Sequence, residues 1–321
     1  MNDSEASTRT TRLAPSPTGA LHLGNARTFL VNYLLARRRG WRILMRMEDL
    51  DSPRVKPWAA QQALDDLQWL SIDWDSTVAK QSDRAEDYQR ALDELVESSD
   101  AYPCICSRKD IQQAGAAPHR DDHITVYPGS CRGKYASAMQ AEKLTGRPAA
   151  WRVRVDSTPI VFDDHLAGHC EINLAETCGD FVIFRNEGLA GYQLAVVVDD
   201  AHQGVDAIVR GDDLLDSTAR QIHLRRLMNL GLDPEYWHVP LVTGADGRRL
   251  AKRHGDTRLS HYRQMGVSPR RILGLLGFWC GLGDEPREMD MPELIDTFDL
   301  SGLSGEPVIF DQACESFLTS G

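Results

Sequence analysis

Strand-type and helix-type segments alternate through residues 11–98, and no other feature of the sequence constrains the fold as strongly. Residues 11–14 and 41–47 are short apolar segments typical of strands, and 24–39, which ends at Gly40, has helical spacing. Two more helices are predicted, at 57–70 and 84–98. Strands joined through helices pair in parallel, with the helices crossing over the faces of the sheet. We therefore predict an α/β fold built on a parallel sheet.

The regular pattern breaks up near residue 101 and resumes near residue 181. The interrupted part contains several cysteines, a stretch rich in Gly, Ala, Pro and His, and one predicted helix at 136–145. We interpret it as an insertion between two halves of the sheet. After it we predict strands at 181–185, 194–198 and 208–209, a helix at 214–230 and a mostly helical end. The predicted units are a disordered tail (1–11), the first half of the sheet domain (12–100), the insertion (101–180), the second half (181–260) and a short helical region (261–321).

The start of the chain is polar and has no apolar segment of the kind found in signal peptides. No other stretch approaches the roughly 20 apolar residues that a membrane span needs. We expect a cytoplasmic protein with a frayed N-terminus.

A glycine- and histidine-containing segment, residues 19–25, lies between the first predicted strand and the first predicted helix. A helix N-terminus offers unpaired N–H groups and a partial positive charge, which suit phosphate groups. Gly24 would let the backbone approach ATP closely, His22 can donate hydrogen bonds to phosphate oxygens, and Asn25 can contact the nucleotide. Alone, the segment is equally typical of a capped loop with an incidental histidine.

A basic, glycine-containing loop far along the chain is the second candidate nucleotide element. It reads Arg248-Arg249-Leu250-Ala251-Lys252-Arg253-His254-Gly255. A lysine in a loop supplies a mobile cation, which can neutralise phosphate charge as a reaction proceeds. By itself the loop is also typical of a solvent-exposed basic turn.

Seven cysteines are present, an odd number that does not suit a disulfide framework. Three of them, Cys104, Cys106 and Cys131, crowd one segment, and three thiolates favour Zn²⁺. The candidates for a fourth ligand are Tyr127, His123 and His119. The alternative interpretation is a group of buried free cysteines.

Taken together, these motifs resemble the class I glutamyl-tRNA synthetases. Residues 12–19 (RLAPSPTG) and 22–28 (HLGNART) resemble the opening of that family, 46–54 (RMEDLDSPR) its next block, and 192–200 (YQLAVVVDD) a third. The basic loop, residues Arg249, Leu250, Ala251, Lys252 and Arg253, resembles the family's mobile signature loop, with Ala251 where serine is commoner. The resemblance implies a Rossmann-like parallel sheet, an inserted zinc-containing subdomain and a short helical C-terminal region.

The resemblance also implies the positions of the substrates. The glutamate site would comprise Arg12, Leu13, Ala14, Pro15, Ser16, Glu48, Tyr192 and Arg210, and the ATP site His22, Gly24, Asn25 and Lys252. These residue types suit the chemistry, since arginines pair with carboxylates and Glu48 can accept the ammonium group. The glutamate α-carboxylate would attack the α-phosphate of ATP, which is bound with Mg²⁺. His22 and Lys252 are expected to stabilise the transition state.

A short branch of the family shares the spacing Cys104-x-Cys106 followed by Tyr127-x-x-x-Cys131. This implies a closed, structural zinc site made of Cys104, Cys106, Tyr127 and Cys131. Residues 256–321 are too few for the anticodon-binding region of full-length members. That branch activates glutamate without tRNA and transfers it to queuosine at the wobble position of tRNA(Asp). We therefore expect tRNA(Asp) carrying queuosine, L-glutamate and ATP as partners, and a monomer without membrane attachment.

Two other functions fit the same residues. One is a truncated glutamyl-tRNA synthetase that charges the 3′ end of tRNA(Glu). The other is a non-catalytic, zinc-stabilised RNA-binding module, although such a module would not need to keep His22, Lys252, Arg12 and Glu48 together. The net charge of −11 argues against non-specific coating of nucleic acid but leaves room for local basic patches that bind tRNA.

Overall fold

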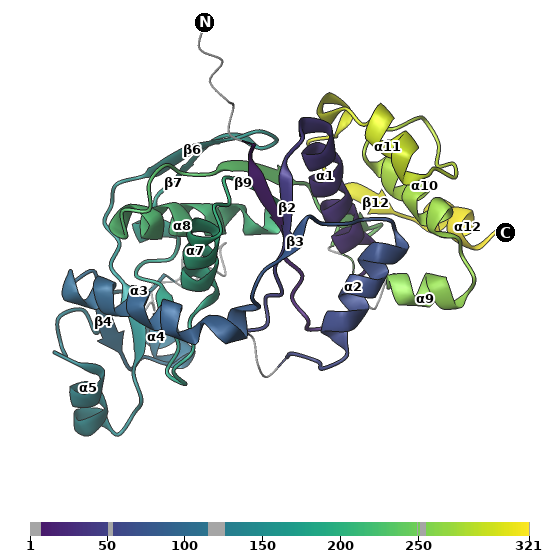
Figure 1. Cartoon of the computed structure of the whole chain (residues 1–321). Helices are drawn as coiled ribbons and strands as arrows, with labels where there is room; N and C mark the ends of the chain where they lie inside the picture. The colour runs from purple at the N-terminus through teal and green to yellow at the C-terminus, as the bar shows by residue number, and fades with distance from the viewer. Residues whose placement is uncertain (1–7, 51–53, 115–125, 249, 251–254, 321) are drawn as a thin grey trace, which may run out of the picture.

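Parallel strands from the two halves of the chain meet edge to edge. The computed structural model describes residues 8–50, 54–114, 126–248, 250 and 255–320 (Figure 1). Strands β1 (Thr10–Leu13), β2 (Arg42–Met45) and β3 (Ser76–Thr77) form a parallel sheet in that order. A second sheet has the order β7-β6-β10-β9, made of β6 (Ile160–Asp164), β7 (Gly168–Ile172), β9 (Ala207–Gly211) and β10 (Glu235–Val239).

In these two sheets β6 and β7 pair antiparallel, whereas β10 is parallel to both of its neighbours, β6 and β9. β1 lies beside β9. The backbone N–H of Asp206, just before β9, donates to the carbonyl of Thr10 in β1 at 3.1 Å. The predicted α/β fold with a parallel sheet is confirmed. Residues 1–7 of the predicted tail lie outside the described residues, and β1 already begins at Thr10.

Helix α1 (Leu23–Arg39) crosses from β1 to β2, as its sequence predicts. His22 caps its start, and it ends at Gly40, whose φ of 66° is left-handed and favours glycine. Its inward face, including Leu30, Val31 and Leu34, is fully buried. The two helices predicted at 57–70 and 84–98 are confirmed as α2 (Ala59–Trp69) and α3 (Ala85–Glu97), with the 3₁₀ turn η1 (Gln81–Arg84) before α3.

The strand predicted at 194–198 is wrong, because these residues lie in helix α7 (Tyr192–His202). A short apolar run with valines is typical of a buried strand, but periodicity alone cannot distinguish it from a buried helix. Here the run packs among α3, β8 (Val182–Phe184) and α8 (Leu215–Leu227), so that Leu194, Ala195 and Val197 are buried. Burial against several elements outweighs the local β preference of valine.

The predicted insertion contributes to two sheets. Strands β4 (Ala101–Cys104) and β5 (Ala150–Val153) pair antiparallel with each other, and β5 pairs with β8 of the following segment. The hairpin β6–β7, also within 101–180, joins β10 in the second sheet. Its helices are α4 (Arg108–Ala114), the predicted α5 (Ala138–Thr145) and α6 (Leu174–Thr177). β4 and α5 lie at the end of the molecule away from the C-terminal helices (Figure 1).

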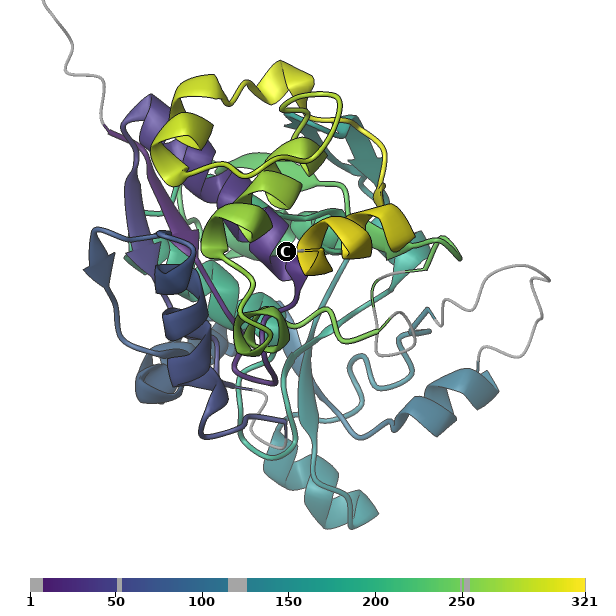
Figure 2. The same cartoon turned by 90° about the vertical axis from the view of Figure 1, so that its right-hand side faces the viewer.

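The end of the chain packs on α1. It consists of α9 (Leu259–Gln264), α10 (Pro269–Trp279), α11 (Met291–Thr297), the 3₁₀ turn η4 (Leu300–Gly302), β12 (Val308–Phe310) and α12 (Gln312–Thr319). The predicted helical character is confirmed, but β12, parallel to β11 (Val242–Gly244), is missing from the prediction. α1 contacts α10 and α11 (Figure 2). None of the described helices is long and apolar enough to cross a membrane.

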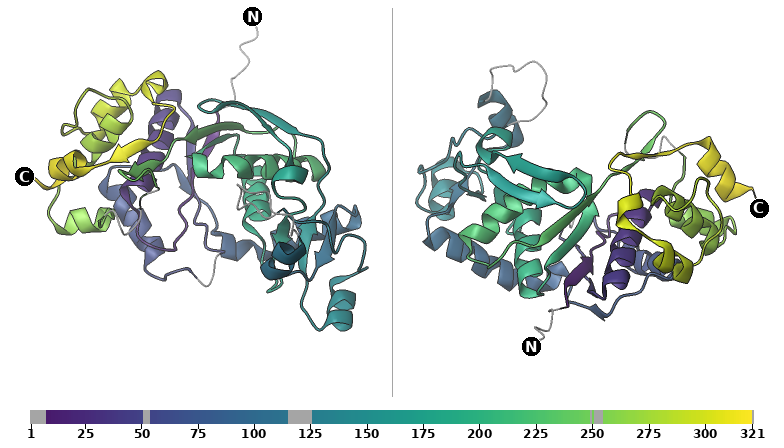
Figure 3. Two further views of the ribbon diagram at one scale, coloured as in Figure 1. Left: turned by 180° about the vertical axis from the view of Figure 1, so that it is seen from behind. Right: turned by 90° about the horizontal axis from the view of Figure 1, so that it is seen from above.

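Besides a small cluster around Tyr102 and Tyr127, the described residues form two large apolar cores. One lies under α1 and the C-terminal helices, and the other surrounds α3, α7 and α8. Seen from above, the teal and green elements form one half of the molecule and the purple and yellow-green elements the other (Figure 3). Because β1 and β9 meet between these halves, the ends of their strands are the place where a shared site can form.

Candidate active site

A cavity of about 550 Å³ opens where β1 and β9 end and α1 begins. Its volume is in the range of small-molecule sites. Nearly all the described residues predicted to bind substrates line it, namely Arg12, Ala14, Pro15, Ser16, His22, Gly24, Asn25, Glu48, Tyr192 and Arg210. Leu13 is the exception, because its side chain is fully buried in the apolar core. The structure thus brings together residues separated by nearly 200 positions in the sequence.

The start of α1 forms the nucleotide side of this cavity. His22 Nδ1 accepts a hydrogen bond from the backbone N–H of Asn25 at 3.3 Å, and Asn25 Oδ1 accepts one from the backbone N–H of His22 at 3.3 Å. This reciprocal pair is a capping box. Because Nδ1 is an acceptor, a neutral His22 ring carries its proton on Nε2. That N–H is a donor suited to a phosphate oxygen.

Gly24 has a role beyond the one that the sequence suggests. A Cβ at this position would lie 3.1 Å from two atoms of the His22 ring, Cε1 and Nδ1. Such a contact is tighter than ordinary van der Waals packing, so a side chain at 24 would displace the imidazole. The glycine therefore leaves room for the ring of His22.

A buried charge cluster (Arg12, Arg46, Glu48, Asp199 and Asp200) adjoins the cavity, which two of its members, Arg12 and Glu48, line. Arg46 is fully buried and donates through Nη1 to Asp200 Oδ1 at 2.6 Å and through Nη2 to Glu48 Oε1 at 3.1 Å. Arg12 Nε donates to the same Asp200 oxygen at 3.2 Å. Asp199 lies 3.9 Å from Arg46 Nε and accepts hydrogen bonds from Gln81 and Tyr88. The cluster therefore holds Arg12 and Glu48 in place at the cavity.

Burial and charge act in opposite directions on these carboxyl groups. Burial would raise the pKa of Asp200, but the positive charges of Arg46 and Arg12 outweigh it, and its pKa is lowered. At Glu48 burial dominates over Arg46 and Arg12, and its pKa is raised from the ordinary value. A positively charged group arriving beside Glu48 would favour its carboxylate form.

Arg210 extends from the end of β9 and is held by neutral side chains. Its Nε donates to His238 Nε2 at 3.0 Å, Nη1 to Gln221 Oε1 at 2.8 Å, and Nη2 to Thr218 Oγ1 at 2.7 Å. Arg12, by contrast, is paired with the carboxylate of Asp200. Within the part of the chain that the structure describes, Arg210 forms no ion pair, so its positive charge is available to an anion in the cavity.

Sequence reasoning missed several residues that organise this cavity. Arg46 and Asp200 lie within the motifs 46–54 and 192–200, but the motifs alone assign them no role. His238 lies outside every motif. An arginine that directly follows buried apolar strand residues, as Arg46 follows the last three residues of β2, is a signal of a buried ion pair, which sequence reasoning could have used.

Of the five signature-loop residues, the structure describes Leu250. Arg249, Ala251, Lys252 and Arg253 lie outside the described residues. Leu250 is buried, and its backbone N–H donates to the carbonyl of Val242, a residue that lines the cavity. Leu250 therefore lies next to the cavity, and the role of Lys252 stays a prediction.

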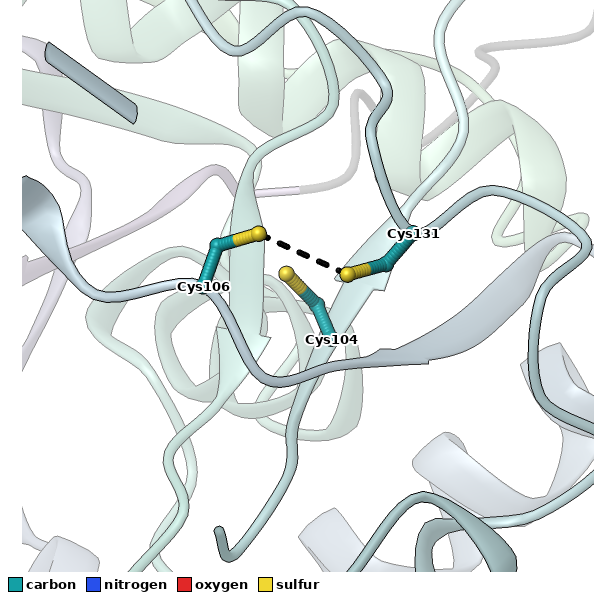
Figure 4. A group of neighbouring side chains, drawn as sticks. All are labelled: Cys104, Cys106 and Cys131. Carbon is teal, nitrogen blue, oxygen red and sulfur yellow. Dashed lines mark hydrogen bonds between the residues drawn. The ribbon is translucent and has the colours of Figure 1, made fainter. Parts of the chain in front are cut away.

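The three clustered cysteines converge in the inserted region (Figure 4). Their Sγ atoms all lie within 4.8 Å of one another, and Cys106 and Cys131 are 3.4 Å apart. The hydroxyl of Tyr127 lies 3.3 Å from Cys104 Sγ. With metal–sulfur bonds of about 2.3 Å, a tetrahedral zinc site needs donor atoms at separations of this kind. The other two candidate ligands, His119 and His123, lie outside the described residues.

The surroundings of this cysteine group suit a cation. Burial and the neighbouring thiols raise the pKa of Cys106 to about 12, so a bound metal would be needed to hold it as a thiolate. Arg152 Nε donates to Cys104 Sγ at 3.3 Å, and its guanidinium carbon lies 3.9 Å from the centre of the Tyr127 ring. This arginine offsets part of the negative charge that three thiolates would bring.

Comparison with known proteins first defines the class. Residues 9–314 match the family model described as tRNA synthetases class I (E and Q), catalytic domain. The glutamate-tRNA synthetase from Elizabethkingia anophelis superposes with a TM-score of 0.82 at 25% identity, covering 97% of this chain and 70% of that one. The fold is thus that of a class I synthetase catalytic domain.

Two curated relatives then define the branch. The glutamyl-Q tRNA(Asp) synthetase of Rhodopirellula baltica is 44% identical over 320 residues, which is 94% of this chain and 96% of that protein. The glutamate–tRNA ligase of Aquifex aeolicus is 36% identical over 308 residues, 94% of this chain but 64% of that protein. The chain belongs to the glutamyl-Q tRNA(Asp) synthetase family, a branch of the class I synthetases, as its motifs predicted.

Proposed function

We propose that this enzyme activates L-glutamate with ATP in the absence of tRNA and then transfers the glutamyl group to queuosine in tRNA(Asp). The observation that carries the proposal is the single cavity that joins the capped start of α1 to Arg210, Arg12 and Glu48. It offers a phosphate-binding helix start beside groups that suit an amino acid with two carboxylates.

In this proposal the pocket recognises glutamate through its charges. The guanidinium of Arg210 pairs with one carboxylate of the substrate. Arg12, which is held by Asp200, donates hydrogen bonds to the second carboxylate. The carboxylate of Glu48 accepts hydrogen bonds from the ammonium group of the substrate, while the hydroxyls of Ser16 and Tyr192 are further hydrogen-bond partners. Tyr192 starts α7 and is partly exposed at the cavity, so its ring is accessible to a substrate.

The first chemical step forms glutamyl-adenylate. An oxygen of the α-carboxylate attacks the α-phosphorus of ATP, the bond to the bridging oxygen breaks, and pyrophosphate leaves. Mg²⁺ bound with ATP shields phosphate charge. His22 is proposed to donate its Nε2–H to phosphate oxygens, and Lys252 to add a positive charge from its loop. Catalysis here rests on positioning and charge, and no protein nucleophile is needed.

We propose that Zn²⁺ occupies the cysteine group, with Cys104, Cys106, Cys131 and Tyr127 as ligands. The close spacing of the three sulfur atoms and the Tyr127 hydroxyl supports this set. Four protein ligands leave no open coordination position, so the metal would stabilise the inserted region and take no part in the reaction.

Metal analysis tests the ligand set. The wild-type protein should contain one zinc per chain, and Cys106→Ser should lose it because a thiolate ligand is removed. Tyr127→Phe should lower zinc affinity more than about tenfold, measured by competition with a chelator. Cys170→Ser, a half-buried cysteine on β7 outside the group, is the matched control and should retain the metal. Unchanged affinity in Tyr127→Phe would exclude Tyr127 as a ligand.

The acceptor is tested by glutamate transfer. We expect labelled glutamate to be attached to tRNA(Asp) that carries queuosine, and not to queuosine-free tRNA(Asp) or to tRNA(Glu). Labelling of tRNA(Glu) would instead establish a short aminoacylating synthetase. Absence of glutamate-dependent ATP–pyrophosphate exchange without tRNA would favour a non-catalytic RNA-binding module.

We further propose that the enzyme works as a monomer in the cytoplasm, where ATP and tRNA are available. Sedimentation analysis of the purified protein tests the oligomeric state.

A further inference from the structure

The contacts of Arg210 raise the question of what keeps its guanidinium in one orientation. Three nitrogen atoms each donate to a different neutral acceptor, on His238, Gln221 and Thr218. Each terminal nitrogen of an arginine carries two hydrogens, so each retains one for a substrate carboxylate. The side chain is nearly buried, at 5% exposure, and its direction therefore depends on these acceptors.

His238 can accept from Arg210 in only one protonation state. Arg210 Nε lies 3.0 Å from His238 Nε2, and an arginine has no acceptor, so Nε2 must be without a proton. The proton of the neutral ring is then on Nδ1. That atom lies 2.7 Å from Asp164 Oδ2, which accepts the hydrogen bond.

Asp164 is itself fixed by backbone groups. Its Oδ1 accepts hydrogen bonds from the backbone N–H groups of Leu166 at 2.9 Å, Ala167 at 2.7 Å and His238 at 3.2 Å. Both side chains of the Asp164–His238 pair are inaccessible to solvent. The pair comes from β6 and β10, two adjacent parallel strands, so the scaffold holds the whole chain of contacts from Asp164 to Arg210.

We propose that Asp164 and His238 are positioning residues for glutamate binding, and that Asp164 selects the histidine tautomer that orients Arg210 toward the substrate. The inference rests on the proposed function, because it assigns Arg210 to a substrate carboxylate. It also explains why a neutral histidine is used at this place. A carboxylate in contact with Arg210 would offset the charge that the substrate needs, whereas an imidazole orients the guanidinium and leaves that charge available.

Asp164→Asn separates positioning from simple packing, because asparagine has nearly the same shape. The three backbone N–H groups require the amide oxygen at the Oδ1 position, so the amide NH₂ must face His238 Nδ1. The ring would then carry its proton on Nε2, which could donate to Thr218 Oγ1 at 3.1 Å but could no longer accept from the Nε–H of Arg210, so the contact that orients Arg210 would be lost. Asp163→Asn is the matched control, since Asp163 pairs with His169 on the same hairpin but is exposed.

Two measurements decide the inference. Nitrogen-15 NMR of labelled histidine should show the Nδ1–H tautomer for His238 in the wild type and the Nε2–H tautomer in Asp164→Asn. In tRNA-free ATP–pyrophosphate exchange, Asp164→Asn should raise the KM for glutamate about 10- to 100-fold, with the KM for ATP changed less than about twofold. Asp163→Asn should match the wild type in both measurements.

A second pair of variants covers the case in which Asp164→Asn does not fold. His238→Gln places an amide oxygen near the position of Nε2, whereas the shorter His238→Asn cannot reach Arg210. His238→Gln should therefore have a KM for glutamate at least about tenfold lower than His238→Asn.

The outcomes distinguish this inference from the function on which it rests. An active wild type with a folded Asp164→Asn variant of unchanged glutamate KM, or with the other histidine tautomer, would overturn the positioning role alone. Equal KM values for His238→Gln and His238→Asn would do the same. A wild type with no glutamate-dependent exchange would overturn the proposed function and this role with it.

Discussion

His22→Asn is expected to lower the kcat of glutamate-dependent ATP–pyrophosphate exchange about 100- to 1,000-fold while leaving the protein folded. Asparagine is among the best residues at the start of a helix, so it can replace the cap that His22 Nδ1 makes with the Asn25 backbone. It is too short to replace the Nε2–H donor at the cavity. The substitution therefore removes the proposed interaction with the phosphates and keeps the local structure.

His22→Ala serves as the comparison for this experiment. It loses the donor and the cap together, so its kcat should fall by the same factor and its free energy of unfolding by about 1 kcal/mol. Urea unfolding of the three proteins measures the second quantity. A His22→Asn enzyme with kcat within threefold of the wild type would show that His22 only caps α1.

Arg46→Met is expected to lower the free energy of unfolding by about 3–5 kcal/mol. Arg46 is fully buried and contacts Asp200 and Glu48, and Asp199 lies 3.9 Å from its Nε. Methionine fills much of the same space but leaves these carboxylates without their shared cation. Removing one partner of a buried ion pair costs far more than the pair contributes, because the remaining charges are desolvated and uncompensated.

Arg37→Met provides the matched control for Arg46→Met. Arg37 also contacts two carboxylates, Asp73 and Asp75, but these are exposed at the surface. Its loss should change the free energy of unfolding by no more than about 1 kcal/mol. Similar values for the two variants in urea unfolding would contradict the role assigned to the buried charge cluster.

Predictions that depend only on residues close together in the sequence are confirmed. The first helix begins at a histidine and ends at a glycine, and both residues act within a few positions of where they stand. The spacing of Cys104, Cys106 and Cys131 likewise predicted a group of sulfur atoms that the structure brings within 4.8 Å. The strand predicted at 194–198 is wrong because burial against other elements decides the secondary structure there. The valines of α7 favour a strand by themselves but are packed as a helix.

The first strand–helix–strand unit, the caps of its helix and the composition of the motifs are determined by the sequence itself, because each depends on neighbouring residues. Contacts across the sheets are decided only by the tertiary structure. Arg12 meets Asp200 across 188 positions, and His238 meets Asp164 across 74. No local preference encodes such pairs. They form because the fold buries these side chains beside one another, from β1 and α7 in the first pair and from β6 and β10 in the second, and buried charges must find partners to replace the solvation of water.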